Sequence, residues 1–193
     1  LLLLISGGHS QYLIVKDINE YEQLGTTIDD ALGEAFDKTA KMLDLGYPGG
    51  PNIEKFAKLG DKTFYKLPEP IINKGGCNLS FAGLKTAVLR ETKNINNEIQ
   101  LKYNLAASFQ HTINKILEKK TKEAMKQFKT KTSINEKITF VVAGGVAANL
   151  SIRENLTKVC EEMSFVPLFP NLEFCGDNAA MIAWAGIKRY KKK

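Results

Sequence analysis

Two glycine turns are the stretches of this chain whose residues could take part in chemistry most directly. Ser6-Gly7-Gly8-His9 follows an apolar run at the start of the chain, and Gly144-Gly145 follows a second apolar run. Glycine lets the backbone take positive φ and approach a ligand closely, and successive N–H groups in such a turn can bind an anion. Ligands of open α/β sheets gather where strands end. The two turns together therefore predict an anion site, with ordinary tight turns as the alternative.

Several familiar kinds of site are not indicated. Neither turn continues into the GK[ST] of a phosphate loop or forms the GxGxxG of a dinucleotide site, and the sequence contains no HExxH. No set of Ser, His and Asp, or of Cys and His, stands out as a nucleophile with its base.

The polar residues near these turns have plain structural explanations when taken alone. Asp30, Glu34 and Asp37 share one face of an expected helix, where a solvated stripe with an ion pair to the lysine one turn later explains them. Asn149 and Asp177 each lie at the expected start of a helix, where both residue types are favoured caps.

The composition is that of a globular protein. The 193 residues are 44% apolar, which is enough for a core. The net charge of +6 suits a polyanionic partner such as RNA, although ordinary solvated faces also explain the basic stretches. Three widely spaced cysteines, Cys77, Cys160 and Cys175, indicate a reducing compartment. Leu1 to Ile5 is too short for a signal peptide or a membrane span.

The first part of the chain has the pattern of three hairpin-connected strands and a helix. Strands are expected at Leu1 to Ile5, Gln11 to Val15 and Tyr21 to Thr26. Apolar residues then recur at helical spacing from Ile28 to Leu43. Within this helix Thr27 and Asp30 match a capping box, and Gly46 ends it.

The rest of the chain alternates irregular, helical and extended stretches. Residues 47 to about 97 contain PGGP, LPEP and NKGG, which predict an irregular insertion with short helices. The later elements are expected to be a helix over 98–128, a strand over 138–143, a helix opened by a Ser151–Glu154 capping box, a strand over 165–169 and a helix from Asp177. This order predicts an α/β fold with a mixed sheet and helices on both faces.

The chain resembles the family of tRNA N6-adenosine threonylcarbamoyltransferases, the TsaD proteins, in six blocks that keep the family's order: SGGHSQ, IDDALGEAFDKTAKML, YPGGP, LSFAGLKTA, VVAGGVAAN and EFCGDNAAMIAWAG. The resemblance implies the actin-like ATPase superfold, whose two lobes each have a ribonuclease-H-like core. Residues 1–193 would form the second lobe, with the insertion at 47–97, and the first lobe would be absent. This accounts for a chain that begins, without methionine, inside an apolar run.

The resemblance also implies an activity and the residues that serve it. Family members transfer a threonylcarbamoyl group from threonylcarbamoyl-adenylate to N6 of adenosine 37 in tRNAs that read codons beginning with A. By motif, the residues around the phosphate and carbamoyl group would be Leu4, Ile5, Ser6, Gly7 and Gly8. Asp37 would contact the ribose, Gly50 the ligand and Asn149 the adenosine. Glu54 matches a second ribose contact of the archaeal branch, with a plain surface role as the alternative.

The same resemblance implies one divalent metal ion, iron or zinc, with Asp177 as a ligand. The family's two histidine ligands come from an HxxxH motif, which this sequence lacks, because its two histidines, His9 and His111, stand far apart. We therefore expect the missing lobe to hold most of the metal's ligands and this chain alone to be inactive. The implied partners are tRNA, a TsaB-like scaffold paralogue and a TsaE-like P-loop ATPase, in the bacterial cytoplasm or an organelle and away from any membrane.

Two other functions remain open at this point. The chain could be a non-catalytic scaffold lobe of the same family, against which the retention of Asp37, Asn149 and Asp177 argues. It could also be a kinase or ATPase of the same superfold, an idea that only the fold supports. Loss of adenylate binding would favour the scaffold, and hydrolysis of ATP would favour the kinase or ATPase.

Overall fold

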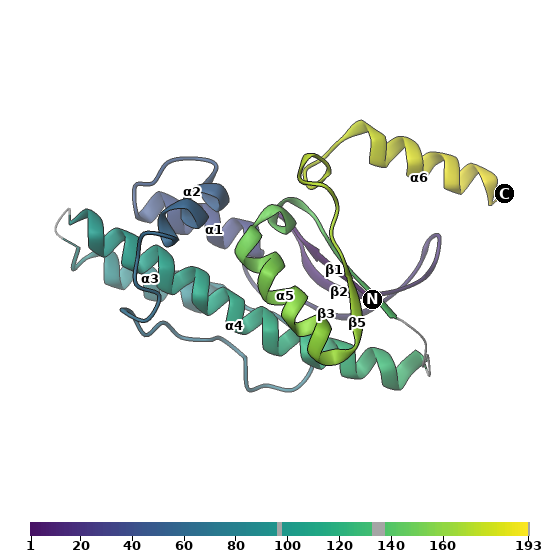
Figure 1. The fold of residues 1–193 in the computed structure, drawn as a ribbon, viewed down its shortest axis with the longest axis horizontal. Helices are drawn as coiled ribbons and strands as arrows, with labels where there is room; N and C mark the ends of the chain where they lie inside the picture. Colours follow the sequence, from purple (N-terminus) through teal and green to yellow (C-terminus); the bar gives the residue numbers. More distant parts are fainter. Residues whose placement is uncertain (96–97, 133–137, 193) are drawn as a thin grey trace.

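A single mixed sheet of five strands organises the molecule, in the order β3-β2-β1-β4-β5 (Figure 1). The computed structural model describes residues 1–95, 98–132 and 138–192. Neighbouring strands are antiparallel in the pairs β1–β2 and β2–β3 and parallel in the pairs β1–β4 and β4–β5. The strands are β1 (Leu2–Ile5), β2 (Ser10–Asp17), β3 (Glu20–Thr26), β4 (Ile138–Ala143) and β5 (Phe165–Leu168). All five strands expected from the sequence are confirmed.

The helices follow the strands in the expected order. They are α1 (Leu32–Met42), α2 (Gly49–Ala57), α3 (Ala82–Thr92), α4 (Ile99–Thr132), α5 (Leu150–Met163) and α6 (Ala179–Lys191), with short 3-10 turns η1 (Gly145–Ala148) and η2 (Leu172–Phe174). Helices α2 and α3 lie within the stretch expected to be an irregular insertion, whose last two residues, 96–97, are outside the described residues. The architecture is α/β, as the pattern of elements predicts.

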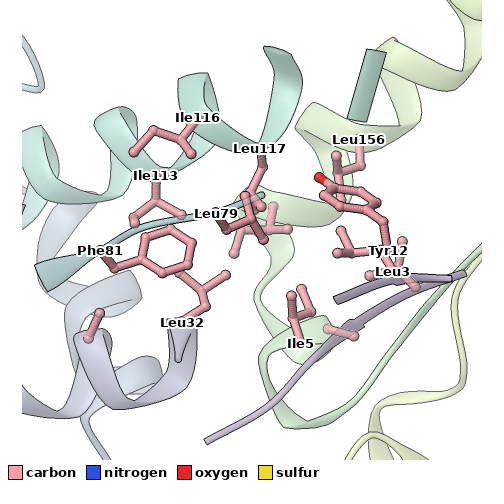
Figure 2. Close-up of a cluster of buried hydrophobic side chains, with 14 of the residues drawn as sticks. Leu3, Ile5, Tyr12, Leu32, Leu79, Phe81, Ile113, Ile116, Leu117 and Leu156 are labelled. Carbon is pink, nitrogen blue, oxygen red and sulfur yellow. The ribbon is translucent and has the colours of Figure 1, made fainter. Parts of the chain in front are cut away.

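One face of the sheet carries the core. Leu3, Ile5, Tyr12, Phe140 and Val142 alternate along their strands and are all fully buried. Figure 2 shows side chains of this face turned toward α4 and α5. The Tyr12 hydroxyl also forms a buried hydrogen bond of 2.8 Å with the Thr121 hydroxyl of α4. The apolar spacing along α4 therefore fixes the helix against the sheet and gives the site a rigid support.

The other face of the sheet is covered less completely than expected. Its residues in β1, Leu2 and Leu4, are only half-buried. Helix α6 contributes no buried residue, and its side chains of Ile182 and Trp184 are 67% and 62% exposed. The C-terminal end of α6 is held by Arg189, which donates to Asn19 in the β2–β3 turn. We expected helices to cover both faces of the sheet. In the described residues they cover one face completely and the other only in part.

The predicted start of α1 is wrong by several residues. The helix begins at Leu32, and Ile28 is 60% exposed. The reason is tertiary pairing, because Thr27 forms a parallel bridge with Leu79 and so continues the extended strand. Thr27 donates to the Asp30 carbonyl and does not cap the helix. Asp30 was expected to complete the capping box. Its carboxylate instead forms ion pairs with lysines of α1 and α3.

The sequence left two caps open for α5, Asn149 and the Ser151–Glu154 capping box, and it predicted Asp177 as the cap of α6. Helix α5 is capped by Asn149, whose Oδ1 accepts from the Ile152 N–H, so Ser151 and Glu154 do not form the capping box. Glu154 pairs with Lys158 one turn along the helix. Helix α6 is capped by Asn178, so Asp177 lies just before the cap. The Asn149 cap is therefore confirmed, the Ser151 capping box is wrong, and at α6 the neighbouring Asn178 takes the cap position in preference to Asp177. No helix in the described part of the chain combines the length and the apolar character that a bilayer span requires.

Candidate functional site

A cavity of about 540 Å³ lies where β1 and β4 end, between their loops and helices α1 and α2. This volume is in the range of small-molecule sites. Six residues that the sequence singled out line it together: Gly7, Asp37, Gly50, Glu54, Gly145 and Asn149. They come from the loops after β1 and β4, from α1 and α2 and from the cap of α5, and they lie up to 142 positions apart in the chain. The other residues of the wall are Gly33, Phe36, Tyr47, Pro48, Pro51, Val146, Ala148, Leu150 and Leu172.

The two strand tips meet through a glycine. Gly144 has φ +97°, and a Cβ built there would lie 2.3 Å from the carbonyl oxygen of Ile5. Only glycine fits a position that combines left-handed backbone with so close an approach. The loop of β4 is therefore pressed against the end of β1, which brings Gly145 and Gly7 into one cavity.

The loop after β1 is folded by Ser6. Its Oγ accepts hydrogen bonds from the backbone N–H groups of Gly8 (3.3 Å) and His9 (3.0 Å). Its carbonyl oxygen accepts from the N–H of Gly33 at the start of α1. The N–H groups of Gly8 and His9 thus form hydrogen bonds within the turn itself, whereas Gly7 is exposed and lines the cavity. Of the residues expected around the phosphate, only Gly7 is among the lining residues.

Two of the expected phosphate-side residues belong to the sheet. Ile5 is fully buried in the core, and Leu4 is half-buried on the opposite face. Ser6 and Gly8 border the lining residue Gly7 without being lining residues themselves. The backbone at this strand tip is consequently close to the cavity, while the side chains of Leu4 and Ile5 serve the sheet.

Asp37 joins α1 to α2 at the cavity wall. Its Oδ1 accepts a hydrogen bond of 2.9 Å from the backbone N–H of Gly49, the first residue of α2. This bond satisfies one of the N–H groups that the start of a helix leaves without a partner. The carboxylate is half-buried, and the contact uses one of its two oxygens. The second oxygen is the atom with which Asp37 could accept from a ligand hydroxyl.

Glu54 makes the corresponding contact between α2 and α5. Its Oε1 accepts a hydrogen bond of 2.9 Å from the backbone N–H of Leu150, the first residue of α5. Helices α1, α2 and α5 are therefore linked in series by two carboxylates that each bond to the first residue of the next helix. Both carboxylates lie at the edge of the same cavity.

Asn149 lies at the base of the cavity wall and is only 7% exposed. Its Oδ1 accepts from the Ile152 N–H, and its Nδ2 donates to Gln110 Oε1 at 2.8 Å. The cap role that the residue type suggests is thus realised. The amide carries two N–H groups and two lone pairs, so one donor and one acceptor position stay outside these bonds.

One side of the cavity is apolar, and sequence reasoning missed it. Phe36, Val146 and Leu172 contribute to this wall, and Tyr47, which is 85% exposed, also lines the cavity. An apolar wall suits an aromatic base, while the carboxylates suit a ribose. The YPGGP block and the second glycine turn point to Tyr47 and Val146, since each lies within three residues of a glycine that lines the cavity.

Asp177 lies apart from this cavity. It is exposed and lines a separate, shallow hollow with residues of α6, including Met181 and Ile182. Across residues 1–95, 98–132 and 138–192, no three His, Cys, Asp or Glu side chains come together as a metal site needs. The donor groups of the described chain do not therefore fit a metal ion by themselves. Neighbouring Cys175 is buried and accepts from the Arg153 guanidinium.

Comparison with known proteins agrees with the six sequence blocks. The family model described as "TsaD: tRNA N6-adenosine threonylcarbamoyltransferase" matches residues 1–184. A protein of that name from Pelagibacter ubique is 62% identical over 193 residues, which are the whole of this chain and 54% of that protein. Proteins of the same name from Rickettsia massiliae and Rickettsia bellii are 50% and 53% identical, and the match spans 56% of each. The chain thus spans about half the length of these relatives.

Proposed function

Because the chain belongs to the TsaD family of tRNA N6-adenosine threonylcarbamoyltransferases, we propose that it provides the adenylate-binding half of such an enzyme. Its mixed sheet flanked by helices agrees with the actin-like, ribonuclease-H-like fold of the family. In this proposal residues 1–193 are the second lobe, and the rest of the active site comes from the part of the relatives that the match does not span.

The proposed reaction is acyl transfer. Threonylcarbamoyl-adenylate is a mixed anhydride, in which the carbamoyl carbon is bonded to a phosphate oxygen of AMP. The N6 amine of adenosine 37 in tRNA attacks that carbon, a C–N bond forms, the C–O bond to phosphate breaks, and N6 loses a proton. AMP leaves with the bonding electrons. The chain's share is to hold the adenylate and to stabilise the departing phosphate.

Each part of the adenylate has a matching group in the cavity. The backbone at Gly7 and Gly145 suits the phosphate, because backbone N–H groups bind anionic oxygens without a counter-charge. Asp37, supported by Glu54, suits the ribose hydroxyls. The apolar wall with Asn149 suits the adenine. The observation that carries the proposal is that Gly7, Asp37, Gly50 and Asn149 all line one cavity of about 540 Å³.

Partners and metal belong to the same proposal. The tRNA is the acceptor substrate, and a TsaB-like paralogue and a TsaE-like ATPase would assemble with the complete enzyme in the cytoplasm. A divalent metal, iron or zinc, would rely on ligands beyond this chain, with Asp177 as a single contribution. No step of the reaction above is assigned to that metal.

A transfer assay tests the proposal. The purified chain is mixed with radiolabelled threonylcarbamoyl-adenylate and a tRNA transcript, with and without the segment of the Pelagibacter ubique relative that the match leaves unspanned. We expect transfer only when both polypeptides are present, and loss of transfer with an Asp37→Asn chain. Robust transfer by the chain alone would refute the division of the active site. No transfer and no adenylate binding in any mixture would leave a scaffold as the function.

A further inference from the structure

The hydrogen bonds of Asn149 continue away from the cavity through two more side-chain amides. Asn149 Nδ2 donates to Gln110 Oε1 at 2.8 Å, and Gln110 Nε2 donates to Asn114 Oδ1 at 3.2 Å. Asn114 Nδ2 then donates to the Ser151 hydroxyl at 2.9 Å. We refer to Asn149, Gln110, Asn114 and Ser151 as the amide relay. It connects the first turn of α5 to α4 and back again.

The direction of the relay is set at one end by the backbone. The Ile152 N–H can only donate, so Asn149 must present its oxygen there and its nitrogen to Gln110. Gln110 must then present its oxygen to Asn149 and its nitrogen to Asn114. A flipped Asn149 would bring two donors face to face at Ile152. The orientation of all three amides therefore follows from one main-chain group and requires an acceptor at position 110.

Burial makes this requirement strict. Asn149 is 7% exposed and Gln110 is 5% exposed at the edge of a second cavity, which Asn114 and Ser151 also line, so water reaches only a small part of either amide. A buried polar group that loses its partner is left with its full desolvation cost. Without Gln110 the Asn149 amide would therefore rotate toward another partner, and its remaining N–H and lone pair would turn with it.

We propose that Gln110 is a positioning residue for recognition of the base, a role that rests on the adenylate-binding function proposed above. Gln110 Oε1 holds one N–H of Asn149, and Ile152 holds one lone pair, so one N–H and one lone pair are left for the ligand. An amide with one donor and one acceptor pairs with adenine, whose N6 donates and whose ring nitrogens accept. Hypoxanthine presents the same two kinds of group in the reverse order, because its O6 accepts and its N1–H donates, so an Asn149 amide held in one orientation distinguishes the two bases.

Two substitutions at position 110 separate positioning from structure. In Gln110→Met the side chain keeps its length but loses the acceptor for Asn149. In Gln110→Glu a carboxylate oxygen still accepts from Asn149 Nδ2. Asn114 can then flip to donate to the second oxygen, because the Ser151 hydroxyl is able to donate in place of accepting. The glutamate variant should therefore keep the orientation of the Asn149 amide, while the hydrogen bonds from position 110 to Asn114 and from Asn114 to Ser151 reverse their direction.

The first test needs no ligand. We expect NMR spectra of the chain to show slow exchange of the Asn149 side-chain N–H protons, and Gln110→Met to speed it about tenfold, the effect of losing one hydrogen bond. Gln110→Glu should leave it unchanged. The control is Gln100→Met, since Gln100 lies on the same helix and donates to Leu59 O and Asn104 Oδ1 away from the cavity. Equal protection of Asn149 in Gln110→Met and in the unmodified chain would overturn the inference.

The second test measures base selectivity by calorimetry with AMP and IMP. We expect a preference for AMP of roughly tenfold, the value of a good bidentate contact to a base. The ratio of the affinities for AMP and IMP should fall toward one in Gln110→Met and stay near tenfold in Gln110→Glu and Gln100→Met. A purely structural role would weaken both nucleotides equally, and an unchanged ratio in Gln110→Met would overturn the inference. Binding of neither nucleotide by the unmodified chain would refute the proposed function, while the NMR result would still decide whether Gln110 positions Asn149.

Discussion

The carboxylate of Asp37 in α1 accepts a 2.9 Å hydrogen bond at Oδ1 from the backbone N–H of Gly49, the first residue of α2. The same side chain lines the cavity at the tips of β1 and β4. One oxygen of Asp37 therefore supports the wall of the cavity, and the other is available to what the cavity holds. This double role makes the two functions separable by mutation.

Asp37→Asn should weaken adenylate binding while leaving the fold intact. The asparagine oxygen still accepts from Gly49, but the charged acceptor for the ribose is lost. A hydrogen bond to a charged group is worth about 1.5–3 kcal/mol, so we expect AMP affinity by calorimetry to fall roughly tenfold to a hundredfold. Asp37→Ala, which loses both contacts, should also lower the melting temperature. Full affinity in Asp37→Asn would remove Asp37 from the ribose site.

Gly144→Ala should destabilise the protein, and Gly145→Ala should not. At Gly144 a methyl group would lie 2.3 Å from Ile5 O on a backbone with φ +97°, whereas at Gly145 nothing lies within 4 Å of the added carbon. We expect urea unfolding to show a loss of roughly 3 kcal/mol for Gly144→Ala and a change within about 0.5 kcal/mol for Gly145→Ala. Similar losses in both variants would contradict the contact between the two strand tips.

The buried thiols should be unreactive in the folded protein. Burial raises the pKa of Cys160 to about 12 and that of Cys77 to about 11, so little thiolate forms at pH 8. Both side chains are at most 1% exposed. Mass spectrometry after iodoacetamide treatment should find these two cysteines unlabelled in buffer and fully labelled in urea. Rapid labelling of either one in buffer would show that the core described here opens readily.

Glu22 should make part of the stability depend on acid pH. Hydrogen bonds from Lys131, at the end of α4, and from Lys16 hold the pKa of Glu22 down at about 2, below its usual 4.5. A lowered pKa means that the stabilisation is complete above pH 4.5 and is lost as the pH falls toward 2. Melting curves of the unmodified chain and Glu22→Gln should differ at pH 7 and converge near pH 2. A constant difference over this range would exclude the ion pairs as its cause.

Strands β1, β2 and β4 could be predicted from the sequence because their apolar runs border glycine turns and need no distant partner to be identified. The start of α1 could not, because Thr27 pairs with Leu79, more than fifty positions away, and this pairing keeps residues 27–28 extended. For the cap of α5 the sequence left both Asn149 and Ser151 open, and the hydrogen bond from Asn149 to Gln110 on α4 favours Asn149. Contacts between distant elements decided both cases.

The residues of the candidate site also fall into those that the sequence predicted and those that only the structure shows. One glycine of each turn, Gly7 and Gly145, and the motif residues Asp37, Gly50 and Asn149 were predicted from the sequence and line one cavity, whereas Asp177 lies apart from it. The apolar wall formed by Phe36, Val146 and Leu172 was not predicted, because such residues are indistinguishable from core residues until the fold leaves them facing a cavity. Gln110 was missed for a similar reason, since its importance comes from its contact with Asn149.

The most direct test of the account is to map AMP binding on the chain by NMR. Backbone and side-chain signals are followed while AMP is added to the labelled protein. The account predicts that the largest shifts occur at Gly7, Asp37, Gly50 and Asn149, the residues around the cavity at the tips of β1 and β4. Shifts confined to other surfaces, or no shifts at millimolar AMP, would contradict the claim that this cavity is the adenylate site.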